Sequence, residues 1–438
     1  VTNIFVSDPS VKATIGVQLD KLEDDLNLVS HSASSDVHFS VNDSARDIAD
    51  ALMSTGASLQ NAEEVIVDGG TVSVSEAADI QSIGNYSAAA SDYAIEDSSG
   101  AILAAGNYNV VVDSGVEQVF VTDTVSVADG VSLSDMEVAL EAERGAETAD
   151  IAFDVAGSAS DIINNASDLS GASNVYVTSG GESGPDGLVM VDATQGVALG
   201  NLENDLKNDD DATGSENVVF GVEDGAEFIA AAISSDPSAL GEAEMIIADG
   251  DGAYVGVEQA AVIQGLSNYN AESSSYGIED SVADILTTVG QNAVEDSGVS
   301  NVYVTDTATV AEGVQLSDLN VALGDISASS SAHIDFNVEG LAVEVLAAGV
   351  ELSGASRVDV TDGSVSASVG VQLDALNDKF AAFSKENTNS FDMSGPAGMS
   401  GPAIMRDSEY FLTEVGEKII DFTVEDTAKN IADELIYD

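Results

Sequence analysis

Acidic side chains are the residues of this sequence that could do chemistry, and the chemistry they suit is calcium binding. Ca²⁺ takes six to eight oxygen ligands, which carboxylates and loop carbonyls supply. Two short acidic segments hold the candidate metal ligands, which are Asp209, Asp210, Asp211, Asp249 and Asp251. Neither segment fits the D-x-D-x-D-G calcium loop with a distal Glu. For these segments, calcium ligation and a plain acidic loop are about equally good interpretations.

A second group of aspartates follows short runs of β-branched residues. Its members are Asp8, Asp68, Asp123, Asp306 and Asp362. They too could bind calcium, but a carboxylate at the end of a strand more often accepts hydrogen bonds from the backbone of a turn or a helix start. We therefore favour a capping role over calcium for this group.

Catalytic motifs are missing from the sequence. There is no Cys, which excludes disulfides, thiol nucleophiles and zinc–thiolate sites, and the three His (His31, His38 and His333) have no metalloprotease spacing. The sequence also has no G-x-S-x-G and no phosphate-binding P-loop. We expect no enzyme and no cofactor other than Ca²⁺.

The excess of negative charge argues against some classes of binding partner. The 438 residues carry 78 Asp and Glu against 11 Lys and Arg, a formal net charge of −67. Nucleic acid would be repelled, because binding it requires Lys and Arg to neutralise phosphates. With 44% apolar residues the chain can still build a core, and no apolar run is long enough to insert into a membrane. Self-repulsion of this size predicts screening by salt or divalent cations; acidity as a device for solubility alone is the other interpretation.

Stepping along the chain, one strand-like signature recurs seven times. Asp8 and Asp362 close the first and last copies, 354 residues and six steps apart, or about 59 residues per step. Between the copies lies a second signature, a strand, an acidic or Gly turn and a helix, with turn positions at Asp43, Asp97, Gly157, Asp224, Asp280, Gly340 and Asp426. These signatures divide the chain into seven repeats, at about 3–63, 64–117, 118–173, 174–243, 244–300, 301–356 and 357–438.

A longer period lies on top of the short one. The segment that starts at Asp113 matches the one that starts at Asp296, an offset of 183 residues, and Asp97 and Asp280 have the same offset. The array therefore consists of blocks of three repeats. Block duplication explains this, and a contact recurring at every third repeat is the functional alternative.

Each repeat is predicted to be β-α-β-α. In the sixth repeat, Val302 to Thr305 is typical of a buried strand that ends at Thr305–Thr307. Thr309 and Glu312 then fit a capping box, and Leu316, Leu319 and Leu323 form a helical stripe, as Leu19, Leu22 and Leu26 do in the first repeat. Gly16, Gly130, Gly196, Gly313 and Gly370 recur in this first helix and predict a bend or a close helix approach.

These elements predict the fold class, an α/β solenoid of seven β-α-β-α repeats with parallel strands, curved or twisted. Parallel strands need crossover helices, and each repeat buries its apolar stripe only by stacking on its neighbours. Neither end carries a polar cap, with Ile4 and Phe5 at the start and Ile436 and Tyr437 at the end. We therefore expect copies of the chain to join end to end, or the array to continue in a longer polypeptide.

One insertion, at about 384–411, interrupts the last repeat. It contains the local repeat MSGPAGMSGPAIM, with Met393, Pro396, Met399, Pro402 and Met405. Adaptable methionines suit a contact surface, so these five residues join the two ends as candidate interface residues. A plain insertion without a partner is the other interpretation.

The paired signatures, VTDT…VA and V-x-D-[ST]-A-x-x-I, resemble repeats of very large secreted surface proteins of aquatic bacteria, both adhesin-like and S-layer-like. The resemblance covers nearly the whole chain except about residues 384–411. It implies export, display at the cell surface and a structural or adhesive role. Such chains often carry calcium-binding modules, but the nonapeptide calcium repeats are absent here.

Two hypotheses about function follow. The first is a structural extracellular protein that forms a filament, sheath or surface layer by end-to-end or lateral packing of its copies. The second is an adhesin stalk that holds a glycan or a protein through the loops Gly180–Gly187, Asn208–Glu216 and Ser384–Phe411. An acidic enzyme is a distant third.

Overall fold

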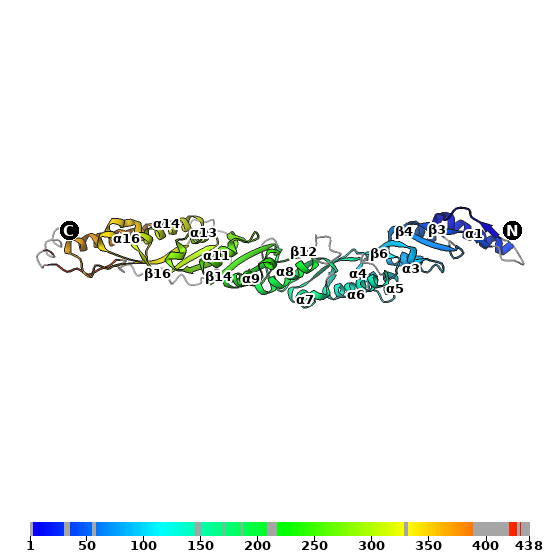
Figure 1. The fold of residues 1–438 in the computed structure, drawn as a ribbon, viewed down its shortest axis with the longest axis horizontal. Coiled ribbons are helices and arrows are strands. Elements are labelled where there is room, and N and C mark those ends of the chain that lie inside the picture. The colour runs from blue at the N-terminus through cyan, green and yellow to red at the C-terminus, as the bar shows by residue number, and fades with distance from the viewer. Residues whose placement is uncertain are drawn as a thin grey trace, which may run out of the picture. The chain divides into compact units, whose positions relative to one another are not determined.

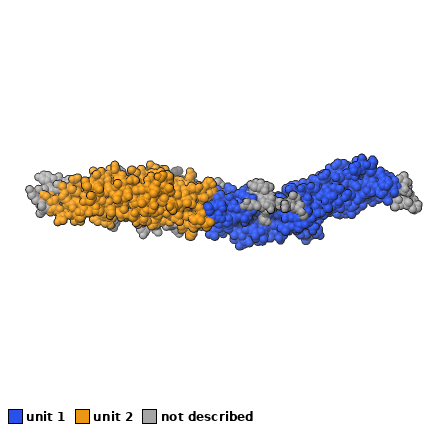
Figure 2. Space-filling view, in the orientation of Figure 1, with its two compact units in different colours: residues 1–222, 236–244 blue, residues 223–235, 245–438 orange. Residues whose placement is uncertain are grey.

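The computed structural model describes most of the chain, in two compact units. The described residues are 3–29, 36–54, 58–144, 150–169, 171–184, 187–207, 217–327, 332–388, 420–426 and 430, with the backbone alone for 251–253 and 381–388. Unit 1 comprises residues 1–222 and 236–244, and unit 2 comprises residues 223–235 and 245–438 (Figure 2). The chain passes from unit 1 to unit 2 within strand β13 (Gly221–Asp224).

Strands and helices alternate along unit 1. Its strands are β1 (Asn3–Phe5), β2 (Asp36–His38), β3 (Ser40–Asp43), β4 (Glu64–Val72), β5 (Asp92–Asp97), β6 (Val116–Val121), β7 (Val125–Ser126), β8 (Asp150–Ser158), β9 (Ala172–Ser179), β10 (Glu182–Ser183), β11 (Val189–Val191) and β12 (Asn217–Val219). Its helices are α1 (Ala13–Val29), α2 (Ala45–Leu52), α3 (Val74–Gln81), α4 (Ser99–Ile102), α5 (Tyr108–Val111), α6 (Val127–Arg144), α7 (Ala159–Asn164), α8 (Ala193–Lys207) and α10 (Pro237–Gly241).

Unit 2 has the same alternation. Its strands are β14 (Met245–Val255), β15 (Ser275–Asp280), β16 (Val299–Thr309), β17 (His333–Gly340), β18 (Arg357–Val360) and β19 (Ile420–Asp421). Its helices are α9 (Ala226–Ser235), α11 (Val257–Gln264), α12 (Val282–Ile285), α13 (Thr288–Val294), α14 (Val310–Ile326), α15 (Ala342–Ala348) and α16 (Ala367–Thr388).

The strands pair in the order in which the chain makes them. In unit 1 the sheet order is β3-β4-β5-β6-β8-β9-β12, and in unit 2 it is β14-β15-β16-β17-β18-β19, with parallel pairing at every described step (Figure 1). The predicted α/β class with parallel strands is thereby confirmed. Between strands the chain returns through helices, as parallel pairing requires.

The long strands change register where the sequence predicts strand ends. β16 continues through Asp306 to Thr309, so the strand end predicted at Thr305–Thr307 is wrong. The pairing of β16 with β17 shifts between Tyr303 and Thr307 instead. A shift of this kind inserts extra residues into one strand and bends it, which frees the Asp306 side chain to leave the sheet.

The predicted stripe of leucines is buried in one helix and partly exposed in another. Leu316, Leu319 and Leu323 of α14 are all buried, as predicted. At the corresponding place in α1, Leu22 is 40% exposed. The difference lies in the neighbours, because α14 contacts both β16 and β17, whereas the described contacts of α1 are with α2, β2 and β3.

The recurrent glycines mark a close approach of helix to strand, not of helix to helix. A Cβ built on Gly16, Gly130, Gly196, Gly313 or Gly370 would lie 2.5–2.8 Å from a valine Cγ2 atom of the neighbouring strand segment. The valines are Val41, Val155, Val222, Val338 and Val424. In these five repeats the first helix therefore packs directly on the second strand.

Two glycines of α14 provide a matched test of this packing. Gly313→Ala should lower the free energy of unfolding by about 1–3 kcal/mol, because the added methyl group overlaps Val338. Gly324→Ala, in the same helix, meets nothing within 4 Å and should be neutral or raise stability by up to about 1 kcal/mol. Urea unfolding of both variants measures this; equal effects would argue against the close approach.

None of the described helices is long and apolar enough to cross a membrane.

Candidate functional site

The strand-end carboxylates form the most regular polar feature of both units. In four repeats the Asp that ends the second strand accepts a hydrogen bond from the first N–H of the helix before that strand. The pairs are Ala13 N to Asp43 Oδ2 at 3.0 Å, Val74 N to Asp97 Oδ2 at 3.2 Å, Val257 N to Asp280 Oδ2 at 3.0 Å and Ala367 N to Asp426 Oδ2 at 3.0 Å. We call this contact a backward cap, because the helix is capped by a residue that follows it in the chain.

The same contact joins consecutive repeats. Here the Asp at the end of a first strand caps the second helix of the repeat before it. The pairs are Ser99 N to Asp123 Oδ1 at 2.6 Å, Val282 N to Asp306 Oδ1 at 2.7 Å and Ala342 N to Asp362 Oδ2 at 2.5 Å. The capping role favoured for Asp123, Asp306 and Asp362 is confirmed, and the bond from Ser99 lowers the pKa of Asp123. Asp68 differs, because the β3–β4 pairing places Gly69 where Asp123 lies in the β5–β6 pairing.

Many backward caps also hold the start of the following helix. Ser98 N donates to Asp97 Oδ1 at 2.8 Å, and Ser281 N donates to Asp280 Oδ1 at 2.9 Å. One carboxylate thus accepts hydrogen bonds at the N-termini of two helices, the one before its strand and the one after it. The positive end of each helix dipole favours a negative charge there. A single residue type at one position can therefore fix three elements.

Two second strands end in glycine and have no such carboxylate. A Cβ on Gly157 would overlap Val127 Cγ2, and a Cβ on Gly340 would overlap Val310 Cγ2. Val127 and Val310 are the first residues of α6 and α14. At these two joints an apolar contact replaces the hydrogen bond, and only glycine leaves room for it.

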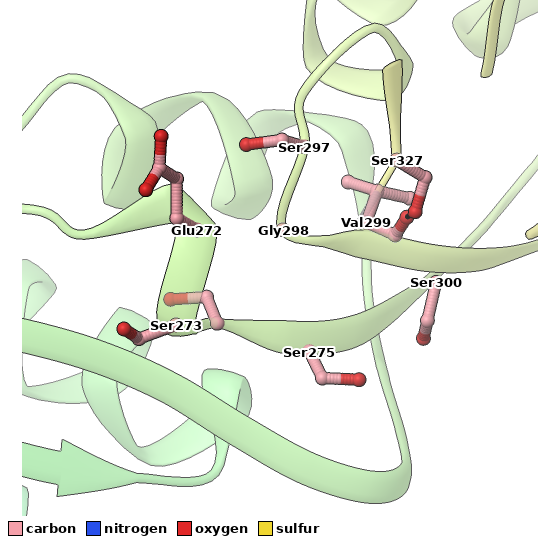
Figure 3. Close-up of a pocket in the computed structure, with 9 residues that line it drawn as sticks. Glu272, Ser273, Ser275, Ser297, Gly298, Val299, Ser300 and Ser327 are labelled. Carbon is pink, nitrogen blue, oxygen red and sulfur yellow. Dashed lines mark hydrogen bonds between the residues drawn. The ribbon is translucent and has the colours of Figure 1, made fainter. Parts of the chain in front are cut away.

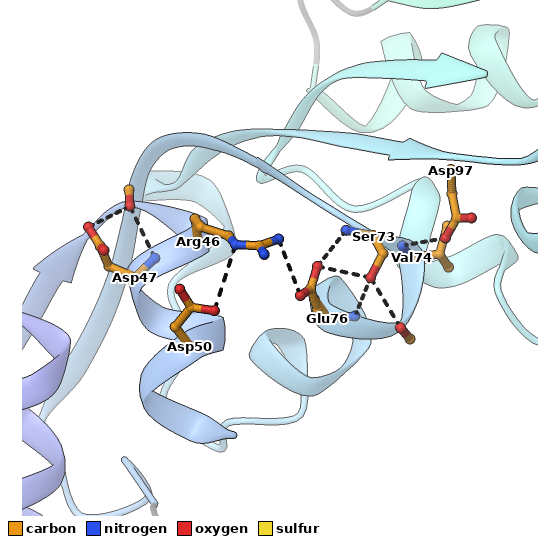
Figure 4. Close-up of polar contacts among 9 residues, drawn as sticks. Arg46, Asp47, Asp50, Ser73, Val74, Glu76 and Asp97 are labelled. Carbon is orange, nitrogen blue, oxygen red and sulfur yellow. Dashed lines mark hydrogen bonds and ion pairs between the residues drawn. The ribbon is translucent and has the colours of Figure 1, made fainter. Parts of the chain in front are cut away.

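Figure 4 shows how a joint in unit 1 combines charges and caps. Ser73 and Glu76 form a capping box, with Ser73 N donating to Glu76 Oε2 at 2.8 Å, and this bond lowers the pKa of Glu76. Arg46 reaches Glu76 at 3.5 Å and Asp50 at 3.7 Å. Arg46 thus bridges the first and second repeats, whereas Lys12 acts within the first repeat by donating to Asp43 at 2.8 Å.

A second recurrent contact ties the first helix to the second strand in five repeats. One side-chain oxygen of the helix accepts a hydrogen bond from a strand N–H. The pairs are Val37 N to Glu23 at 2.9 Å, Ile151 N to Glu137 at 3.1 Å, Val218 N to Glu203 at 3.2 Å, Ile334 N to Asn320 at 2.6 Å and Ile420 N to Asn377 at 3.2 Å. Sequence reasoning missed this position, although it always lies seven residues after the helical glycine.

Burial raises the pKa of two of these acceptors. It raises the pKa of Glu137 to about 8; the hydrogen bond from Ile151 N lowers this pKa, and the neighbouring Asp150 raises it. Burial also raises the pKa of Glu203, although Lys207 lies 2.6 Å from it. Lys207 lies equally close to Glu242 and lowers the pKa of that more exposed carboxyl.

A buried network of hydroxyl and amide groups occurs once in each unit. In unit 1, Gln81 Nε2 donates to Tyr93 Oη and to the carbonyl of Val110, both at 2.8 Å, and Tyr86 Oη donates to Asp113 Oδ1 at 2.8 Å. Unit 2 repeats these contacts with Gln264, Tyr276, Ala293, Tyr269 and Asp296. Burial raises the pKa of Tyr93 to about 12, so both tyrosines stay neutral donors.

Unit 2 has a hollow of about 260 Å³ beside this network (Figure 3). Its lining is rich in hydroxyl groups and comprises Glu272, Ser273, Ser274, Ser275, Ser297, Gly298, Val299, Ser300 and Ser327. At the matching positions of unit 1, Asp92 and Glu117 share a hydrogen bond that raises the pKa of Glu117, and Arg144 donates to Ser114 O at 3.3 Å. The hollow can hydrogen-bond a neutral polar group; it carries no catalytic arrangement of side chains that we recognise.

The structure places two of the five predicted metal ligands, and the calcium hypothesis stays a prediction. Asp209, Asp210 and Asp211 lie outside the described residues. Asp249 and Asp251 belong to strand β14 and not to a loop, and the Asp249 side chain is exposed. The pairing of β14 with β15 shifts register between Asp249 and Tyr254. Within the described residues no group of three or more His, Asp and Glu could hold a metal ion.

Of the predicted interface residues, two can be placed. Ile4 is half-buried and Phe5 is 72% exposed in β1, where the Phe5 ring stacks on His38 at 4.3 Å between ring centroids. Exposed Phe5 does not single out this end, because Phe120 and Tyr303 are also exposed at the same register position. Met393, Pro396, Met399, Pro402, Met405, Ile436 and Tyr437 lie outside the described residues.

The remaining predicted loops and histidines have ordinary settings. The segment at Gly180–Gly187 contributes β10 to an antiparallel pair with β11. His38 Nδ1 lies 2.6 Å from Glu63, while His31 lies outside the described residues. Helix α16 runs to Thr388, so the first residues of the insertion at 384–411 are helical.

Comparison with known protein families and with curated proteins finds no match for this chain.

A backward cap can be tested against its neighbour in the same strand. Asp280→Ala removes the acceptor of Val257 N and Ser281 N and should lower the free energy of unfolding by about 1–2 kcal/mol. Glu279→Ala removes the same charge from an exposed side chain and should change it by less than about 0.5 kcal/mol. Urea unfolding at one salt concentration compares the two variants, and an equal loss would exclude a special role for the cap.

Glu137 makes stability depend on pH. Its folded pKa of about 8 lies above the ordinary value of 4.5, so the folded chain holds a proton that the unfolded chain releases. This contribution is complete below pH 4.5 and is lost as pH rises to 8. Relative to Glu137→Gln, the wild type should lose about 2–4 kcal/mol between pH 5 and pH 9, measured by chemical unfolding. Parallel pH profiles of the two proteins would contradict the assignment.

Proposed function

We propose that the chain is a structural extracellular protein whose seven β-α-β-α repeats stack as a solenoid and whose copies assemble into a filament, sheath or surface layer. In this proposal the chain is secreted or displayed on a cell surface, and its partners are copies of itself and dissolved cations. No catalysis is part of the proposed role.

The backward cap between repeats is the observation that carries the proposal. Asp123, Asp306 and Asp362 each complete a helix of the repeat before them. In such a fold the same contact recurs at one junction after another, always from a strand to the helix of the preceding repeat. Extension by further copies requires no new kind of contact, which is the property of a building element.

The charge supports a salt-dependent assembly. With a net charge of −67, two copies repel each other at every approach. The Debye length falls from about 30 Å at 0.01 M salt to about 3 Å at 1 M. Contacts between apolar strand edges then prevail over repulsion, which makes marine, saline or calcium-containing surroundings the natural setting.

Sedimentation velocity and electron microscopy of the full-length chain test the proposed role. We expect monomers at about 0.01 M NaCl and growing assemblies toward 1 M NaCl, since screening removes the repulsion. Adding CaCl₂ at constant ionic strength separates general screening from specific calcium binding. Monomers under all of these conditions would refute the structural role.

The second candidate is an adhesin stalk that binds a glycan or a protein. The hydroxyl-lined hollow of unit 2 favours it, because neutral hydroxyls suit the hydrogen-bonding groups of a sugar. The same salt series discriminates the two candidates: a stalk stays monomeric at every salt concentration and carries its activity as a single chain.

A further inference from the structure

The pairing of consecutive repeats follows one rule in five places. A buried aliphatic residue of a second strand lies directly opposite a buried aliphatic residue of the next first strand. The pairs are Val41 with Val65, Ile95 with Val119, Val155 with Val175, Ile278 with Val302 and Val338 with Val358. All ten side chains are at most 1% exposed. This rule predicts which residues must meet wherever two repeats join.

Two strand segments, β1 and the segment around Val424, each contain one residue of such a pair without the opposing residue. Ile4 lies opposite Val37 in β1–β2, just as Val119 lies opposite Ile151 in β6–β8, so Ile4 is the counterpart of Val119. Val424 pairs with Val365, just as Ile95 pairs with Val72, so Val424 is the counterpart of Ile95. Within the described residues, the outer edges of both segments have no partner strand.

Both segments are exposed where their counterparts are buried. Val424 is 41% exposed, and Ile4 is half-buried. Leu22 of α1 is 40% exposed, while Met136, Leu202, Leu319 and Leu376, which lie at the same distance after the helical glycine, are buried. The exposed surface therefore consists of positions that repeat packing covers elsewhere in this chain.

Asp8 lies at the position of a capping aspartate but has no helix to cap within the described residues. It follows Phe5 by three residues, as Asp123 follows Phe120 and Asp306 follows Tyr303. Asp123 and Asp306 each cap a helix of the repeat before them. Asp8 is exposed and makes no such bond within the described residues.

We propose that β1 of one copy pairs in parallel with residues 423–426 of a second copy, with Ile4 opposite Val424, Phe5 opposite Glu425 and Val6 opposite Asp426. Asp8 then approaches that copy at the register at which Asp123 and Asp306 approach the repeat before them. This head-to-tail joint rests on the proposed structural role and specifies its register. A free Ser7 N–H would donate to the carbonyl of Asp426, as Thr122 N donates to Asp97 O at 3.0 Å.

Cysteine cross-linking reads out the register directly, because the natural chain has no Cys. Two single variants, Ile4→Cys and Val424→Cys, are mixed in 1 M NaCl and oxidised. Directly opposed residues of neighbouring strands have Cα atoms about 5 Å apart, within the range that a disulfide spans. We expect a mixed dimer on a non-reducing gel, and a ladder from the double variant.

Phe5→Cys mixed with Val424→Cys is the matched control. Successive residues of a strand point to opposite faces, so this pair should yield at least tenfold less mixed dimer. Far-ultraviolet circular dichroism of the reduced variants verifies that each still folds.

The possible outcomes separate this inference from the structural role. Assemblies that form in salt without the Ile4–Val424 cross-link, or that cross-link equally well through Phe5, overturn the head-to-tail register and leave lateral packing. Monomers under all conditions, with no cross-link, refute both.

Discussion

The hydrogen bond from the first amide of a helix to the carboxylate of the next strand is the contact on which this architecture depends. A helix start leaves N–H groups without partners inside the helix. In this chain those groups are satisfied by residues that arrive only after the helix is complete, such as Asp97 for α3 and Asp306 for α12. Each helix that has a backward cap gains it when the following strand pairs, which couples consecutive elements energetically and in one direction.

This contact also explains how so acidic a chain can fold. Carboxylates at helix starts are stabilised as anions, as the lowered pKa of Asp123 and Glu312 indicates. Buried carboxylates behave in the opposite way, because burial raises the pKa of Glu137 and holds its proton. Asn320 and Asn377 make the same contact without an ionisable group. The contact between a first helix and its second strand thus needs only an acceptor oxygen. A negative charge is favoured at the backward caps, where the carboxylate faces the positive end of a helix dipole.

Local patterns predicted the elements well, and tertiary relationships escaped them. The capping box at Thr309 and Glu312 and the stripe from Leu316 to Leu323 depend on helical spacing, which the sequence shows directly. The continuation of β16 through Asp306 depends on a register shift, which local residue preferences do not encode. The direction of the caps was missed because an Asp before a helix is ordinarily assigned to that helix. The loop predicted around Asp249 is a strand instead, because a strand and a loop of the same composition look alike.

Comparing positions 183 residues apart shows which residues both copies keep and which differ between them. Both units keep the Gln–Tyr and Tyr–Asp contacts, with Gln81 and Gln264 each donating at 2.8 Å. Around that shared network, Asp92, Glu117 and Arg144 of unit 1 give way to Ser275, Ser300 and Ser327 of unit 2. Because both sets surround the same packed elements, stability does not dictate the serines. Any recognition that distinguishes one repeat from another is therefore carried by such surface positions, while the caps and buried valines hold the strands and helices of the fold together.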